Sequence, residues 1–319
     1  MVQPGGGWLP RRKGFGAERA FSTLTLVAGA MVLVIIVAIT AFLIAKAIPA
    51  LQADEANFIT ETDWFPNQEP PEFGIAAIAW GTLVTSLIAL IVAVPIALGI
   101  ALYLSHYAGR RVATTFGFLV DLLAAVPSVV FGLWGFIVFI RPVRTFSVWL
   151  NDYFGWLPFF DGTGPFGRSF LLGGLVLAIM VLPIITALSR EVFMQTPTTD
   201  EEAALSLGAT RWEMIRTAVL PYGRAGVIAS IMLGLGRALG ETIALALTLG
   251  FINEITVNII QNGGNSIAAN IANGFGEAGD IGRGALIASG LVLFGITLVV
   301  NAAARVIIYR RREFTESAA

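Results

Sequence analysis

The sequence predicts an all-α, polytopic membrane protein with six transmembrane helices. Of its 319 residues, 56% are hydrophobic and only 13% are charged, whereas soluble domains carry about 25% charged residues. The apolar residues also gather into six runs of about 20 residues or more, the length that a helix needs to cross a bilayer. The absence of cysteine excludes disulfides, thiolate metal sites and cysteine nucleophiles. The net charge of −1 gives no indication of nucleic-acid binding, and we expect no cofactor and no bound metal.

The chain divides into two tails and a membrane domain. We expect tails at residues 1–20 and 309–319, on either side of a transmembrane domain that covers 21–308. The six spans are predicted at 21–48, 78–104, 113–140, 169–188, 225–251 and 284–308. Because the first run is longer than the roughly 7–15 apolar residues of a signal peptide, we expect it to remain as a membrane anchor.

The segments between the spans differ in composition. Residues 49–77 contain prolines that argue against regular helix, and they hold no Lys or Arg. Their acidic residues are Asp54, Glu55, Glu61, Asp63, Glu69 and Glu72. Residues 141–168 predict an aromatic loop, 252–283 a loop rich in Asn and Gly, and 189–224 a long charged loop. The one histidine, His106, is interpreted as a plain interfacial residue near a span end.

Lysine and arginine indicate which side of the membrane each segment occupies, since cytoplasmic segments carry an excess of them. Six spans place both termini on one side. The segments on that side hold 14 Lys and Arg, whereas the opposite side holds five. We therefore expect both termini and the loop 189–224 to be cytoplasmic.

The charged loop carries a pattern for two short helices joined by a sharp turn. Thr199 with Glu202, and Thr210 with Glu213, each fit a capping box at a helix start. Gly208 between them suits the left-handed residue that ends a helix. The simpler interpretation is a capped hairpin that links two spans. The alternative is a rigid element that is presented to a partner.

Three charged residues are predicted inside the membrane. Arg237 and Glu241, four residues apart, are expected on one face of the fifth span, with Asp121 at a similar depth in the third. An isolated charge there costs at least a few kcal/mol, so it should face the protein interior or a wet path. A structural pair and a gate or anion contact in the pathway both stay open. Gly236 and Gly240 predict a face for close helix packing.

The charged loop resembles the EAA loop of ABC importer permeases, E-A-A-x3-G-x9-I-x-L-P, with Ala218 in place of the Ile. The residues that carry the resemblance are Glu202, Ala203, Ala204, Gly208, Leu220 and Pro221. The resemblance implies the type I ABC importer permease fold and a coupling helix that docks on a cytoplasmic dimer of ATP-binding subunits. Since no segment matches the P-loop pattern, we expect this chain to be no enzyme itself.

The stretch from Trp80 to Leu249 is similar to phosphate-specific importer permeases, closest to their C subunit. Residues 81–102, 121–135 and 234–246 carry this similarity. It implies phosphate import across a bacterial cell membrane, with a second permease subunit and an extracytoplasmic phosphate-binding protein as partners. In that family, an Arg and a Glu matching Arg237 and Glu241 are implicated in transport.

The charges fit phosphate only in part. Asp121 and Glu241 outnumber Arg237 in the predicted membrane core, so we expect no high-affinity anion site in this subunit alone. A permease for another oxyanion and a signalling platform that reports phosphate status are the alternatives. An intramembrane enzyme is a weaker option, because no base is paired with Ser128 or Ser230.

Overall fold

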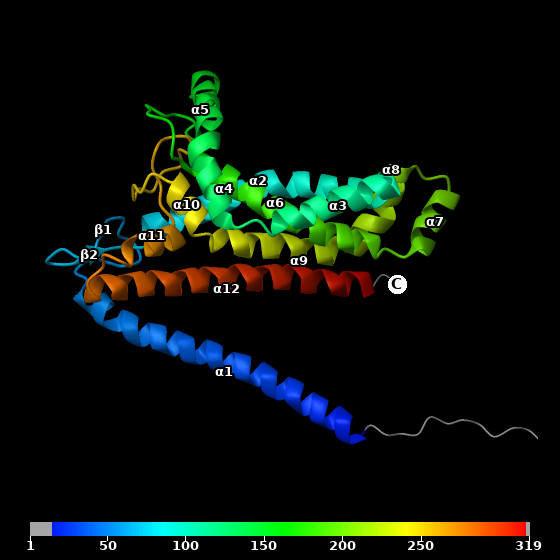
Figure 1. Ribbon diagram of the computed structural model, residues 1–319, viewed down its shortest axis with the longest axis horizontal. Coiled ribbons are helices and arrows are strands. Elements are labelled where there is room, and N and C mark those ends of the chain that lie inside the picture. Colours follow the sequence, from blue (N-terminus) through cyan, green and yellow to red (C-terminus); the bar gives the residue numbers. More distant parts are fainter. Residues whose placement is uncertain (1–14, 317–319) are drawn as a thin grey trace, which may run out of the picture.

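The computed structural model describes residues 15–316, which form an elongated, almost entirely helical molecule (Figure 1). Within this part of the chain, six helices are long and apolar enough to cross a membrane: Arg19–Ala53, Ala76–Tyr107, Ser128–Phe154, Phe170–Met194, Arg211–Leu239 and Asp280–Val306. The prediction of six transmembrane helices is thus confirmed. Most of the predicted tail 1–20 and the end of the tail 309–319 lie outside the described residues.

The elements comprise helices, three short π-helical segments (η) and one two-stranded hairpin. In chain order they are α1 (Phe15–Ala53), β1 (Trp64–Phe65), β2 (Glu72–Phe73), α2 (Ala76–Leu102), η1 (Tyr103–Tyr107), α3 (Arg110–Ala124), α4 (Ser128–Trp134), η2 (Gly135–Phe139), α5 (Ile140–Phe154), α6 (Phe170–Met194), α7 (Thr198–Ser206), α8 (Arg211–Met214), η3 (Ile215–Val219), α9 (Leu220–Leu239), α10 (Ile243–Thr248), α11 (Ile267–Gly274) and α12 (Asp280–Glu316).

Helix α6 is the centre of the bundle and packs against α2, α3 and α9. Ala89, Ala93 and Ala97 lie four residues apart on one face of α2, in a buried cluster with Leu177 and Ile185 of α6. Small side chains let two helix backbones approach closely in a membrane. Helices α12 and α1 lie outside this centre, and α1 diverges from the bundle along its length (Figure 1).

Helix α9 also approaches α6 through small residues, but not through the predicted ones. A Cβ on Gly226 or Gly234 would lie within 2.8 Å of side chains on α6, whereas a Cβ on Gly236 would have nothing within 4 Å in the described chain. The predicted Gly236–Gly240 packing face is therefore wrong within this chain. Residues two apart on a helix point in nearly opposite directions, so the contact at Gly234 turns Gly236 away from α6.

The third predicted span is interrupted and longer than expected. Helix α3 ends at Ala124 and α4 begins at Ser128, because Pro127 disfavours helical geometry at the residue before it. The helix then continues through η2 and α5, so half of the predicted loop 141–168 is helical. Hydropathy marks apolar residues, whereas α5 is amphipathic, and its helical pattern extends beyond the apolar run.

The fifth predicted span, 225–251, is likewise not one helix. Its helix begins as early as Arg211 and ends at Leu239, and after a three-residue break the short α10 follows. The second, fourth and sixth spans lie within longer helices. A helix is held by its backbone hydrogen bonds, so it can extend beyond the apolar run that marks the membrane-crossing part in the sequence.

Loops close the end of the bundle that lies opposite α7. Trp64 pairs with Phe73 in the β1–β2 hairpin, inside the segment where prolines argued against helix. The Asn- and Gly-rich loop folds over the start of α2, where the indole nitrogen of Trp80 donates to the carbonyl of Thr256 at 2.7 Å. The Asn258 carboxamide oxygen accepts from two backbone N–H groups of the same loop.

Candidate functional site

Helices α7 and α8 form a hairpin that projects from one end of the bundle (Figure 1). No residue of α7 is buried. Gly208 has a φ of 86°, which confirms the predicted left-handed turn. A Cβ at this glycine would have nothing within 4 Å, so the turn is open on its outer side.

The second predicted capping box is present and the first is not. Thr210 Oγ accepts from the Glu213 N–H, and the Glu213 carboxylate accepts from the Thr210 N–H at 2.7 Å. The Thr210 backbone N–H and, to a smaller extent, the Thr210 hydroxyl both donate to the Glu213 carboxylate, and they lower its pKa from the ordinary value. The box predicted for Thr199 and Glu202 is wrong, because Pro197 takes the cap position and starts the helix two residues earlier.

The residues of the EAA pattern divide into two groups. Ala204 and Leu220 are partly buried against a cluster that joins the ends of α2 and α6 to η3. Glu202, Ala203, Gly208 and Pro221 are exposed. The pattern therefore combines a face that fixes the hairpin to the bundle with a face that is open to solvent.

The structure shows one contact of the hairpin that the sequence did not predict. His106 Nε2 lies 3.3 Å from the Glu201 carboxylate of α7, and its Nδ1 lies 2.7 Å from Ser105 Oγ. The His106 side chain is only 8% exposed. The interpretation of His106 as a plain interfacial residue is thus wrong: it joins the end of the second span to α7. The two residues are 95 positions apart, and no local signal relates them.

Apolar side chains gather at the exposed tip of the hairpin. Leu207 is 89% exposed and Trp212 is 56% exposed, with Leu205 beside them. Single exposed apolar residues are common on protein surfaces, so these three indicate a contact surface only together with the EAA pattern around them. A signal for this was present in the sequence, since these residues interrupt an otherwise charged loop.

Arg237 and Glu241 do not share a helix face. Glu241 lies in the break after α9, is 7% exposed, and accepts a hydrogen bond from the Ala244 N–H at 3.2 Å, which caps α10. Arg237 lies in the last turn of α9 and forms no ion pair with any described residue. The predicted shared helix face is therefore wrong, because α9 ends at Leu239 and Glu241 lies in the break before α10. Of the two interpretations that the sequence left open, the Arg–carboxylate pair is absent from the described residues, and the role in the pathway stays a prediction.

The other end of α10 is held by a residue that the sequence did not single out. Arg168 Nε and Nη2 both donate to the carbonyl of Leu247, at 3.1 and 3.0 Å. Its guanidinium lies over the rings of Phe136 and Phe251. Helix α10 is thus held at its start by a carboxylate and at its end by a guanidinium.

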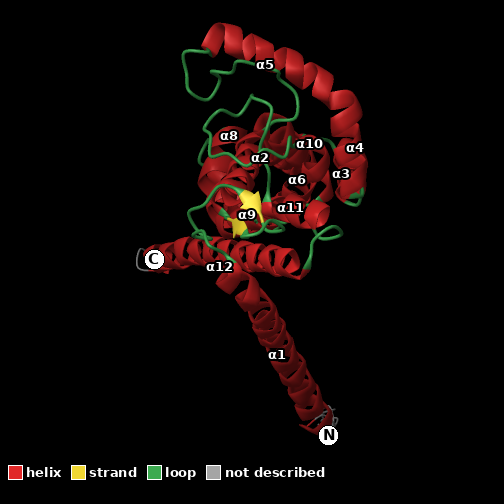
Figure 2. Cartoon of the chain, turned by 90° about the vertical axis from the view of Figure 1, so that its left-hand side faces the viewer, coloured by secondary structure: helices red, strands yellow, loops and turns green. Residues whose placement is uncertain are grey.

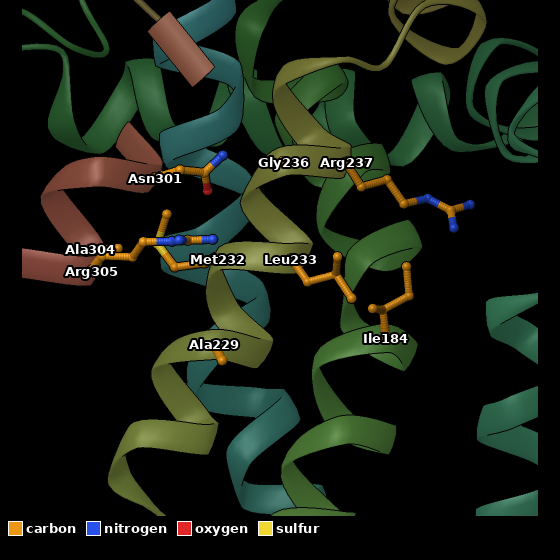
Figure 3. Close-up of a pocket in the computed structure, with 9 residues that line it drawn as sticks. All are labelled: Ile184, Ala229, Met232, Leu233, Gly236, Arg237, Asn301, Ala304 and Arg305. Atoms are coloured by element: carbon orange, nitrogen blue, oxygen red, sulfur yellow. The ribbon is translucent and has the colours of Figure 1, made fainter. Parts of the chain in front are cut away.

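A cavity of about 640 Å³ lies along one face of α9, with α12 on one side and α6 on the other, and Arg237 is one of its lining residues (Figure 3). Figure 3 shows Arg305 of α12 reaching toward α9, while Arg237 extends from the opposite side of α9. The lining contains no carboxylate: its residues are Ile184, Ala229, Met232, Leu233, Gly236, Arg237, Asn301, Ala304 and Arg305. Asp121 is exposed on α3 and does not line it. The cavity lining therefore holds two arginines and no carboxylate.

The sequence pattern of binding-protein-dependent transport system inner membrane components matches residues 93–313, from α2 through the α7–α8 hairpin to α12. The chain belongs to this family. Among curated relatives of these transport components, the phosphate transport system permease protein PstC 2 of Mycobacterium tuberculosis is 45% identical over 303 residues, which cover 93% of both chains. The PstC protein of Xylella fastidiosa is 41% identical over 300 residues, or 92% of this chain and 91% of that one.

Solved structures of transport components share the fold. A chain of the inward-facing MetNI methionine ABC transporter matches with a TM-score of 0.51 at 15% identity, over 72% of this chain and 93% of that one. A chain of a bacterial ABC transporter involved in the import of alginate matches with a TM-score of 0.52 at 17% identity, over 91% and 99%. The type I ABC importer permease fold is thus confirmed.

Proposed function

We propose that this chain is the membrane-spanning permease subunit of an ATP-driven importer that brings inorganic phosphate into the cytoplasm. The observation that carries the proposal is the similarity, over more than nine-tenths of the chain, to phosphate transport permeases. The cavity along α9, with two arginines and no carboxylate in its lining, supports an anionic substrate, because the guanidinium of arginine is always charged and matches phosphate oxygens.

The proposed orientation places the α7–α8 hairpin and both termini in the cytoplasm of a bacterial cell. The distribution of Lys and Arg supports it. The start of α1 and the end of α12 also lie toward the same end of the molecule as α7 (Figure 1). The acidic segment 49–77 then faces outward, where an extracytoplasmic phosphate-binding protein would deliver its substrate.

The hairpin is the proposed contact with a dimer of ATP-binding subunits. Its exposed residues, Glu202, Ala203 and Leu207 among them, would dock on that dimer, while Ala204 and Leu220 transmit the movement to the bundle. Closure of the dimer on ATP would displace α7 and tilt the spans to which it is fixed. A second permease subunit would complete the pathway, and Arg237 would line part of it. Glu241 would fix the position of α10. Asp121, which is exposed on α3, would face the second permease subunit.

The deciding experiment is reconstitution of this chain with its co-purifying subunits and a phosphate-binding protein in proteoliposomes. We expect labelled phosphate to accumulate only with ATP, and excess sulfate not to compete. Accumulation of a different oxyanion would instead identify another substrate. An assembled complex that accumulates no phosphate although it hydrolyses ATP would contradict a transport role and favour the signalling alternative.

A further inference from the structure

Helix α5 differs from the spans in its direction. Figure 1 shows it running across the axis of α2, α6, α9 and α12, and Figure 2, turned by 90°, shows α4 and α5 as an arc at the edge of the bundle. It lies near the end that carries α10 and the β1–β2 hairpin, opposite α7. A helix in this position runs along a membrane surface. Of the continuous helix Ser128–Phe154, which is long and apolar enough to cross a membrane, only α4 and η2 would then enter the bilayer, and α3 would complete the third span.

One face of α5 is fixed to the bundle. Val143, Ser147 and Leu150, which share a face because they are three or four residues apart, are all buried. They lie in a cluster with Leu172 of α6 and Ile260 of the loop after α10. The orientation of α5 about its own axis is therefore determined by tertiary contacts.

A second face is aromatic and uncovered. Phe146, Trp149 and Tyr153 again follow helical spacing, and the last two are 46% and 68% exposed. The rings of Phe146 and Trp149 stack with centroids 5.7 Å apart, and the Tyr153 ring lies tilted beside Trp149 at 5.5 Å. At about 100° per residue, this face lies roughly 100° around the helix from the buried face.

The third face is mostly polar. Arg141, Arg144 and Asp152 are exposed on it, and the exposed Val148 lies among them. This face is centred roughly 130° around the helix from the aromatic face and roughly 140° from the buried face. A helix that lies at the boundary between lipid and water needs one face packed on the protein, one apolar face toward the lipid and one polar face toward water. Helix α5 has these three faces. Trp and Tyr prefer that boundary, because each ring has an apolar body and a polar group.

We propose that α5 is an interfacial helix that binds the phospholipid layer of the leaflet opposite α7, with Trp149 and Tyr153 at the depth of the lipid headgroups. The adjoining η2 supports lipid over a protein partner, because its consecutive residues Phe136, Ile137 and Val138 are all apolar and exposed, on more than one side of the helix. The apolar surface thus extends from the headgroup level into the hydrocarbon. The proposal does not depend on the transported substrate.

The absence of native cysteine permits a direct test with single spin labels. Trp149→Cys and Arg144→Cys are labelled separately in the full chain, purified with its co-eluting subunits and reconstituted in phosphatidylethanolamine–phosphatidylglycerol vesicles. Arg144 is exposed and lies about 140° around the helix from Trp149. We expect the label at 149 to collide mainly with dissolved oxygen and the label at 144 mainly with a water-soluble nickel chelate. Equal nickel accessibility at both sites would overturn the proposal, as would a label at 149 that is shielded from both reagents by protein.

A second measurement avoids the label. Lipids brominated near the headgroup quench tryptophan at that depth, so Trp149→Phe should lower the quenched fraction of the fluorescence. The matched control is Trp212→Phe in the α8 turn, which lies at the other end of the molecule and should raise that fraction. An unchanged quenched fraction in Trp149→Phe would place the indole outside the lipid and overturn the proposal.

Discussion

Two breaks in the helical chain, one in the α7–α8 hairpin and one between α9 and α10, have different origins. The first is formed by residues close in sequence: Gly208 with its φ of 86°, and the capping box of Thr210 and Glu213. The turn itself is exposed and involves no distant residue, although α7 before it contacts His106. A break of this kind is specified locally and stays in place when its surroundings change.

The break between α9 and α10 depends on the rest of the fold. Glu241 caps α10 from within the protein, and Arg168, 79 residues from Leu247, closes its other end. The contrast indicates that the hairpin is a rigid external element, whereas the intramembrane break can shift when the helices around it move. In our proposal, the ATP-binding subunits displace the α7–α8 hairpin, and the break between α9 and α10 changes shape as the spans move.

The largest effect is expected for Gly208→Trp. A positive φ strains any residue with a Cβ, and the indole would also project from the open side of the turn. Phosphate uptake with ATP should fall to background, and the ATP-binding subunits should no longer co-purify. Gly208→Asn, which tolerates the left-handed conformation better, is the matched control and should retain most of the coupling. Normal coupling in the Trp variant would show that this face contacts no partner.

A smaller effect is expected at the intramembrane break. Glu241→Gln keeps an oxygen that can accept from the Ala244 N–H, whereas Glu241→Ala removes it. Loss of a hydrogen bond to a charged group costs about 1.5–3 kcal/mol, so the Ala variant should unfold at lower temperature in detergent. Equal unfolding temperatures for the Ala and Gln variants would rule out the cap.

The neighbouring arginine should behave differently. Because Arg237 has no described ionic partner and lines the cavity, Arg237→Gln should lower uptake by about tenfold, or about 1.4 kcal/mol in the barrier. Its unfolding temperature and co-purification should match wild type. Normal uptake would make Arg237 a structural residue.

The contact between His106 and Glu201 should contribute modestly to coupling. Partly exposed ion pairs contribute about 0–1 kcal/mol, so His106→Gln or Glu201→Gln should each reduce phosphate-stimulated ATP hydrolysis by only about twofold to fivefold. The double variant should lose no more than either single one, since both remove the same contact. Additive losses would show that the two residues act separately.

The smallest effect is a pH dependence of the hairpin. The folded pKa of Glu213 is lowered by the Thr210 hydrogen bonds, so its contribution to stability is present above the unfolded pKa and is lost as the pH falls through the folded value. Glu213→Ala should therefore be less stable than wild type at pH 7, with the difference shrinking on acidification below the ordinary value of 4.5. Glu213→Gln can still accept the hydrogen bond, and its stability should not follow this pH dependence.

The sequence anticipated the exposed parts of the site better than the buried ones. Gly208 and the Thr210 capping box follow from local chemistry, and the structure agrees. The placement of Arg237 and Glu241 on one helix face assumed an unbroken helix and was wrong, because α9 ends at Leu239 and α10 begins only at Ile243. The cavity and its two arginines were also missed, since Arg305 is 68 residues from Arg237 in sequence.

By itself, the sequence determined the number of spans, the turn at Gly208 and the resemblance to importer permeases. These depend on hydropathy, on backbone propensity and on spacing within about 20 residues. Only the tertiary structure decided the direction of α5, the break before α10, the His106–Glu201 contact and the meeting of two arginines in the cavity lining. Each of these depends on side chains that come together only when helices pack, and no property of a single segment encodes which helix will be its neighbour.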